Sequence, residues 1–130
     1  FLHIADAAGS AAVAAGTLTV GLLGTAFTME QDFLTSRLAA QGLNVLVPNA
    51  EERQAVHRII YEELCVGVIS EASRQVYQRV IASLAARGAQ AVILGCTEIG
   101  LLIKPEHCDL PLLDTTALHA QAAVAFALQD

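Results

Sequence analysis

A cysteine follows an apolar run and a glycine in the segment Ala91-Val92-Ile93-Leu94-Gly95-Cys96-Thr97-Glu98. The apolar run predicts a buried strand, and in an open α/β sheet the carboxyl ends of the strands carry side chains into a ligand crevice. A helix that begins after Cys96 would direct backbone N–H groups and its positive dipole end at the sulfur, which favours the thiolate. Cys96 is therefore a candidate catalytic thiol.

The same residues also allow a structural interpretation. A free cysteine is often a small buried apolar side chain, Thr97 would be the N-cap of the next helical turn, and Glu98 an early acidic residue that suits the helix dipole. However, a structural cysteine does not need a hydroxyl and a carboxylate beside its sulfur, or a preceding glycine that lets another group approach the backbone. We therefore favour the catalytic interpretation.

A second polar turn, Gly24-Thr25-Ala26-Phe27-Thr28, follows the apolar run that ends at Leu23. Its glycine spacing matches neither a dinucleotide-binding motif nor a P-loop, so a phosphate site is only weakly indicated. Thr25 and Thr28 could instead hydrogen-bond a small carboxylate beside a helix N-terminus. Turn formation with a helix N-cap explains these residues equally well, and both interpretations stay open.

The three cysteines are odd in number and widely spaced, which argues against a disulfide framework and against a zinc site. Their use favours a reducing, cytoplasmic setting. We expect Cys65, near a helix end, to be a packing residue and Cys108, in a loop, to be a surface thiol.

The histidines give no metal-ligand spacing, so no metal is expected. His57 lies on a predicted helix among charged residues and His107 in a predicted loop, where solvated roles are the ordinary interpretation. His3 and His119 lie in the terminal segments, where a lone histidine more often makes a structural hydrogen bond.

Composition limits the class of protein. The 130 residues are 55% hydrophobic and carry a net charge of −6 without any Lys/Arg cluster, which suits one globular domain and argues against nucleic-acid binding. Residues 7–29 lack charge but are rich in Ala, Gly, Ser and Thr, so we expect a helix and a strand there and no membrane span. The opening Phe1 stands inside an apolar pattern, and we expect a fragment of a longer protein.

Short apolar runs alternate with amphipathic helical patterns along the chain. The strands are expected at residues 18–24, 43–47, 91–94 and 111–113. Helices are expected from Asp6 to Gly16, Thr28 to Gln41, Asn49 to Leu64, Ser70 to Gly88, Ile99 to Ile103 and Asp114 to Leu128. This alternation predicts an α/β fold with a parallel sheet of about four strands covered by helices on both faces.

Three segments together resemble the cofactor-independent aspartate/glutamate racemase family. They are Val92 to Ile99, the turn Leu23-Gly24-Thr25 with Thr28-Met29, and the opening His3-Ile4-Ala5-Asp6. The resemblance covers essentially the whole chain as the later half of such an enzyme, and it is closest to the broad-specificity L-aspartate/glutamate racemases. The Gly-Cys-Thr-Glu sequence is its specific part.

Members of that family have two α/β lobes, each with a cysteine that faces the substrate Cα. The resemblance therefore implies that residues 17–111 are the second lobe, with Cys96 as its acid/base, and that residues 1–16 and 112–130 belong to or contact the first lobe. It also implies that no cofactor is used. The substrate contacts that it implies are Thr25, Thr28, Thr97 and Glu98.

The partner cysteine of the first lobe has no counterpart in this chain, because neither Cys65 nor Cys108 matches it. We expect the parent protein to racemise aspartate or glutamate and the fragment alone to be inactive. As partners we expect an amino acid or dicarboxylate and a second copy in a homodimer. The alternatives are a hydantoin racemase or maleate isomerase of the same superfamily, or a non-catalytic dicarboxylate-binding module.

Overall fold

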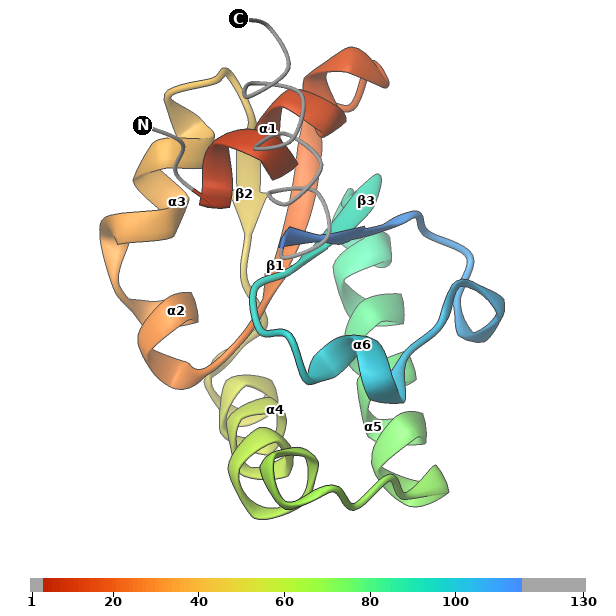
Figure 1. Cartoon of the computed structure of the whole chain (residues 1–130). Coiled ribbons are helices and arrows are strands. Elements are labelled where there is room, and N and C mark those ends of the chain that lie inside the picture. The colour runs from red at the N-terminus through yellow and green to blue at the C-terminus, as the bar shows by residue number, and fades with distance from the viewer. Residues whose placement is uncertain (1–3, 116–130) are drawn as a thin grey trace, which may run out of the picture.

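The computed structural model describes residues 4–115. They contain helices and a four-stranded parallel sheet in the order β2-β1-β3-β4 (Figure 1). The strands are β1 (Thr19–Leu23), β2 (Asn44–Leu46), β3 (Ala91–Leu94) and β4 (Leu112–Asp114). The helices are α1 (Ile4–Ala14), α2 (Ala26–Glu30), α3 (Asp32–Ala39), α4 (Ala50–Glu62), α5 (Glu71–Ala86) and α6 (Ile99–Leu102), with 3-10 turns η1 (Leu64–Val66) and η2 (Pro105–His107).

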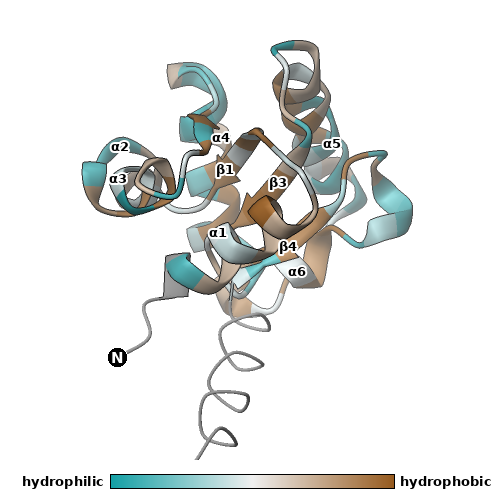
Figure 2. Ribbon diagram, turned by 90° about the horizontal axis from the view of Figure 1, so that it is seen from above, coloured by the Kyte–Doolittle hydropathy of each residue, from teal (hydrophilic) through white to brown (hydrophobic). Residues whose placement is uncertain are grey.

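The two interior strands, β1 and β3, send alternate side chains into two apolar layers. One layer joins Val20, Leu22, Ala91 and Ile93 to α1 and α3. The other joins Leu23, Val92 and Leu94 to α4, α5 and α6. Figure 2 shows α4 and α5 on one side of these strands and α1 on the other. The predicted α/β fold with helices on both faces is confirmed, because only strands buried on both faces can be apolar at every position.

Several helix boundaries follow from the predicted caps. Asn49 begins α4 with a capping box that it shares with Glu52, and the Ser70 side chain accepts from the backbone N–H of Ser73 at the start of α5. Gly88, just after α5, has a φ of +111°, the left-handed region that was expected there.

Two predicted helix starts are wrong. Asp6 lies inside the first turn of α1 and not at the position before it, and its carboxylate pairs with Arg37 at 2.9 Å. Thr25, and not Thr28, is the N-cap of the helix after β1. The helix expected up to Gln41 is also two helices, because Gln31 adopts an extended backbone between α2 and α3. The helix expected after Asp114 and the residues His3 and His119 lie outside the described residues.

The terminal segments that we expected to contact another lobe also pack against this sheet. Ala8 and Ala12 of α1 are buried against it, and β4 pairs with β3 in the register Leu94↔Asp114. Their assignment to a further lobe stays a prediction. Within the described residues, no helix is long and apolar enough to cross a membrane.

Tyr77 makes a hydrogen bond between the two long helices, α4 and α5, that cover one face of the sheet. Its buried hydroxyl donates to the carbonyl of Val56 at 2.8 Å and so joins α5 to α4. We expect Tyr77→Phe to lower the free energy of unfolding by about 1 kcal/mol, because a buried neutral hydrogen bond is lost without a cavity. Urea unfolding should show a lower midpoint at an unchanged m-value.

Tyr61→Phe is the matched control for that substitution, because Tyr61 lies on α4 and its side chain is exposed. We expect it to leave the unfolding midpoint within error of the unsubstituted protein. Equal losses in the two variants would contradict the role given to the Tyr77 hydroxyl.

Candidate active site

The two predicted polar turns lie side by side at the carboxyl edge of the sheet. Strands β1 and β3 pair up to Leu23↔Leu94, and the Gly95 N–H continues the ladder by donating to the Leu23 carbonyl at 2.7 Å. The chain leaves β1 toward β2 on one side, whereas β3 lies on the other side. The two turns therefore follow the strands at which the strand order reverses, the position where open α/β sheets bind ligands.

Thr28 packs into the space that two glycines leave between these turns. A Cβ on Gly24 would lie 2.9 Å from Thr28 Cγ2, and a Cβ on Gly95 would lie 3.1 Å from the same atom. Both distances are shorter than ordinary carbon–carbon contacts. The absence of side chains at Gly24 and Gly95 is thus what lets Thr28 lie against the backbone beside Cys96.

Cys96 is half-buried, and its Sγ donates to a Glu98 carboxylate oxygen at 2.9 Å. Burial, followed by the hydrogen bond to the Glu98 carboxylate, raises the pKa of the Cys96 thiol to about 11. The expectation that the start of the helix after Cys96 makes the thiolate the favoured form is therefore wrong. The physical reason is that the backbone N–H of Glu98 does lower this pKa, but burial and the Glu98 carboxylate raise it by more.

The hydrogen bond from Cys96 also lowers the pKa of Glu98, which stays ionised. Glu98 stands at the N-cap of α6 but makes no side-chain capping bond there, and its carboxylate instead accepts from the thiol. Thr97 is exposed and is not the N-cap, contrary to the structural interpretation of that residue. Within the motif, Glu98 is thus the residue whose side chain bonds the sulfur.

The Thr25 hydroxyl caps the N-terminus of α2. Thr25 Oγ1 accepts from the Thr28 N–H at 3.4 Å and lies 3.2 Å from Thr28 Oγ1. Both side chains are half-buried at the edge of the sheet. The structure thus brings Thr25 and Thr28 to the turn beside Gly95, and their contact with a carboxylate stays a prediction.

Two residues near these turns were missed from the sequence. His57 of α4 accepts the Ala26 N–H at its Nδ1, at 2.8 Å, so it contacts the threonine turn and is not simply solvated. Thr115 is buried, and its hydroxyl donates to the Leu94 carbonyl at 2.8 Å. No local pattern indicates either contact, because the partners are 31 and 21 residues apart.

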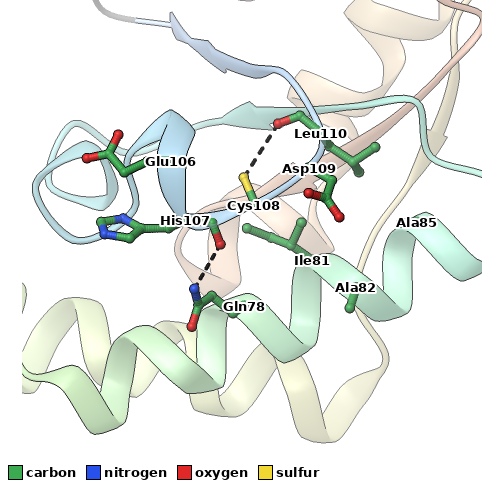
Figure 3. Close-up of a pocket in the computed structure, with 9 residues that line it drawn as sticks. All are labelled: Gln78, Ile81, Ala82, Ala85, Glu106, His107, Cys108, Asp109 and Leu110. Carbon is green, nitrogen blue, oxygen red and sulfur yellow. Dashed lines mark hydrogen bonds between the residues drawn. The ribbon is translucent and has the colours of Figure 1, made fainter.

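The roles expected for the other two cysteines are reversed. Cys65 is exposed, whereas Cys108 is half-buried, packs against the apolar layer and donates to the Leu110 carbonyl at 3.4 Å. Cys108 lines a pocket of about 360 Å³ between α5 and residues 106–110 (Figure 3). That pocket contains none of the residues of the two turns. Among the described residues, no cluster of three His, Cys, Asp or Glu could hold a metal ion.

We expect Glu98→Gln to lower the pKa of the Cys96 thiol. The side-chain hydrogen bond and the charge of Glu98 both raise this pKa, so removal of the carboxylate favours the thiolate. The rate of Cys96 alkylation by iodoacetamide, followed by peptide mass spectrometry across pH, should then rise at lower pH than in the unsubstituted protein. Cys108 in the same samples is the internal control, and an unchanged Cys96 profile would contradict the prediction.

The fold and the two turns define a doubly wound α/β domain with two polar turns at the carboxyl edge of its sheet. The model of the Asp/Glu/hydantoin racemase family matches residues 1–123, and the chain belongs to that family. The resemblance inferred from the motif around Cys96 is confirmed at this level.

Solved structures agree with this assignment. A Yersinia pestis protein assigned as an Asp/Glu racemase is 52% identical with a TM-score of 0.94, over 98% of this chain and 56% of its own. An aspartate racemase homologue from Pyrococcus horikoshii is 35% identical with a TM-score of 0.90, over 97% and 55%. The aspartate racemase of Picrophilus torridus, 22% identical with a TM-score of 0.74 over 98% and 52%, shares the fold. The chain spans little more than half the length of these proteins.

Proposed function

We propose that the parent protein racemises aspartate or glutamate without a cofactor, with Cys96 as the acid/base on one face of the substrate Cα. The observation that carries the proposal is the Cys96 thiol, hydrogen-bonded to an ionised carboxylate at the switch point of the sheet, in a member of a racemase family. Inversion of a stereocentre requires a proton to leave one face and another to arrive on the opposite face, so two groups are needed. We place the second group outside residues 1–130.

The protonation state of Cys96 suggests its part in this exchange. With a pKa of about 11, the sulfur is a thiol at neutral pH and is ready to donate a proton to the carbanion. The Glu98 carboxylate orients the S–H bond and disfavours premature ionisation. When turnover runs in the other direction, Cys96 must enter the cycle as the thiolate left by the preceding proton donation.

We propose that four residues contact the substrate beside the sulfur. Thr25 and Thr28 offer hydroxyls at the turn after β1, where they could donate to the substrate carboxylates, while Thr97 follows Cys96 directly. Glu98 would lie near the substrate ammonium group, with which its negative charge is compatible. Closure over the site would exclude water and strengthen these interactions at the developing negative charge.

The surface around this edge fits a site that another part of the parent protein covers. Large apolar side chains are exposed there on three elements, at Phe27 (69%) of α2, Val66 (69%) of η1 and Leu101 (54%) of α6. We propose that this other part covers these three side chains, because burial would remove their apolar surface from water. We also propose that the parent protein forms a homodimer, which sedimentation velocity would test. We further propose that it is located in the cytoplasm, where the thiol stays reduced.

Exchange in deuterium oxide tests the proposed activity on the full-length protein. Proton NMR should show loss of the Cα hydrogen of aspartate or glutamate, and chiral chromatography should show the opposite enantiomer. Exchange of a substituted hydantoin, but not of either amino acid, would favour a hydantoin racemase of the same family. A trapped covalent adduct with maleate would indicate addition chemistry, and binding without exchange would indicate a non-catalytic module.

A further inference from the structure

His57 joins α4 to the turn that carries Thr25. Its half-buried ring accepts the Ala26 N–H at Nδ1, at 2.8 Å, and stacks at a tilt on the Tyr61 ring with 4.6 Å between centroids. Because Nδ1 accepts a hydrogen bond from a backbone amide, it carries no proton in this arrangement, and the neutral ring holds its proton on Nε2. The contact thus fixes one tautomer of His57.

The hydrogen bond satisfies a backbone donor that α2 cannot satisfy itself. The first N–H groups of any helix lack intrahelical acceptors, and in α2 the Thr25 hydroxyl accepts only the one from Thr28. A helix of five residues is too short to be stable alone, so tertiary contacts must fix its position. His57 provides one such contact, and the Arg53–Glu30 ion pair, at 3.3 Å, provides another from the same helix α4.

The position of α2 bears on the sulfur through Thr28. The Thr28 side chain lies in the space left by Gly24 and Gly95. Gly95 directly precedes Cys96 in the chain, and its N–H donates to the Leu23 carbonyl. A shift of α2 would therefore move Thr28 against the backbone that carries the thiol. Packed interiors transmit such shifts because they contain few voids.

We propose that His57 is a positioning residue. Its unprotonated Nδ1 holds the Gly24–Thr28 turn in place, so that the Thr28 side chain stays packed against Gly95 beside Cys96. The inference rests on the proposed function for its effect on catalysis, although the structural contact is independent of it. His57 touches neither the reacting atoms nor the sulfur in this arrangement. It acts through Ala26 and α2.

Two substitutions separate the hydrogen bond from the packing of the ring. His57→Phe keeps an aromatic ring for Tyr61 but removes the acceptor, whereas His57→Asn keeps an acceptor atom close to the position of Nδ1 and removes the ring. In the full-length protein we expect His57→Phe to lower kcat/KM about tenfold, since small displacements of a site are costly to rate. We expect His57→Asn to recover to within about threefold of the unsubstituted protein by the same argument. Tyr61→Leu, which removes only the ring contact, is the matched control and should keep full activity.

Amide exchange measured by NMR gives a second readout that does not depend on activity. The Ala26 amide should exchange at least about tenfold faster in His57→Phe than in His57→Asn, because only the latter retains an acceptor. Nitrogen-15 NMR of the unsubstituted protein should also show an unprotonated Nδ1 at His57, so the test does not require that a variant fold.

The outcomes separate this inference from the proposed function. If Ala26 exchange is equal in the two variants, if Asn gives no rescue, or if Nδ1 carries the proton, His57 is not a positioning residue. If the parent protein racemises no substrate, the proposed function fails, while the Ala26 and Nδ1 measurements still decide the role of His57.

Discussion

Cys96→Ser in the full-length protein should abolish racemisation in both directions, with a loss of about 10³-fold or more in kcat. A serine hydroxyl fills nearly the same space, but it is a far weaker acid than the thiol and cannot exchange a proton at working pH. Each turnover needs a competent group on both faces of the Cα, so both directions are affected. Chiral chromatography of the product from each enantiomer measures the loss.

Cys108→Ser is the matched control for this experiment. Both cysteines are half-buried, and burial raises the pKa of both thiols. They differ in the acceptor of the S–H group, which is a carboxylate for Cys96 and the Leu110 carbonyl for Cys108. We expect Cys108→Ser to retain full activity. A Cys96→Ser protein that racemises at the parent rate would show that Cys96 is a structural cysteine.

Gly95→Ala should destabilise the protein by about 1 to 3 kcal/mol and lower activity together with stability. The new Cβ would lie 3.0 Å from the Leu23 carbonyl oxygen, which belongs to an interior strand, and 3.1 Å from Thr28 Cγ2. The backbone of β1 has little freedom to retreat, so the strain falls on Thr28 and on the Gly95 hydrogen bond, whose length is 2.7 Å. Urea unfolding and racemase kinetics on the same preparation measure the two effects.

Gly100→Ala is the control for the added methyl group. In α6 its Cβ would lie 3.2 Å from Asp114 Oδ2, which is the end of a side chain and not backbone. Alanine is also favoured over glycine in a helix by up to about 1 kcal/mol, which offsets a small adjustment of Asp114. We expect Gly100→Ala to be close to neutral, and a Gly95→Ala protein of equal stability would contradict the close packing described for the turn.

The strongest sequence patterns led to the correct layers of the fold. The apolar runs around Val20 and Val92 predicted buried parallel strands because residues that face two covered sides of a sheet must all be apolar. The alternation of these runs with amphipathic helices predicted the α/β class, and the Asn49 and Ser70 caps were found because a cap involves residues only three positions apart.

Electrostatic and long-range features could not be predicted in the same way. The pKa of Cys96 was expected to fall but rises, because it depends on burial and on the direction of the Glu98 side chain, and neither is encoded locally. The exposure of Cys65 and burial of Cys108 were reversed for the same reason. The contact between His57 and Ala26 requires the packing of α4 against α2, which no local spacing specifies.

The sequence by itself therefore determined the α/β class, the family and the presence of two polar turns after apolar strands, since these depend on periodicity and on neighbours along the chain. Only the tertiary structure decided that β1 and β3 are adjacent, that Thr28 packs on Gly95, and that burial together with the Glu98 carboxylate raises the pKa of the Cys96 thiol. The physical reason is that proximity, desolvation and hydrogen-bond direction arise between segments far apart in the chain, and these are the quantities that set the chemistry of Cys96.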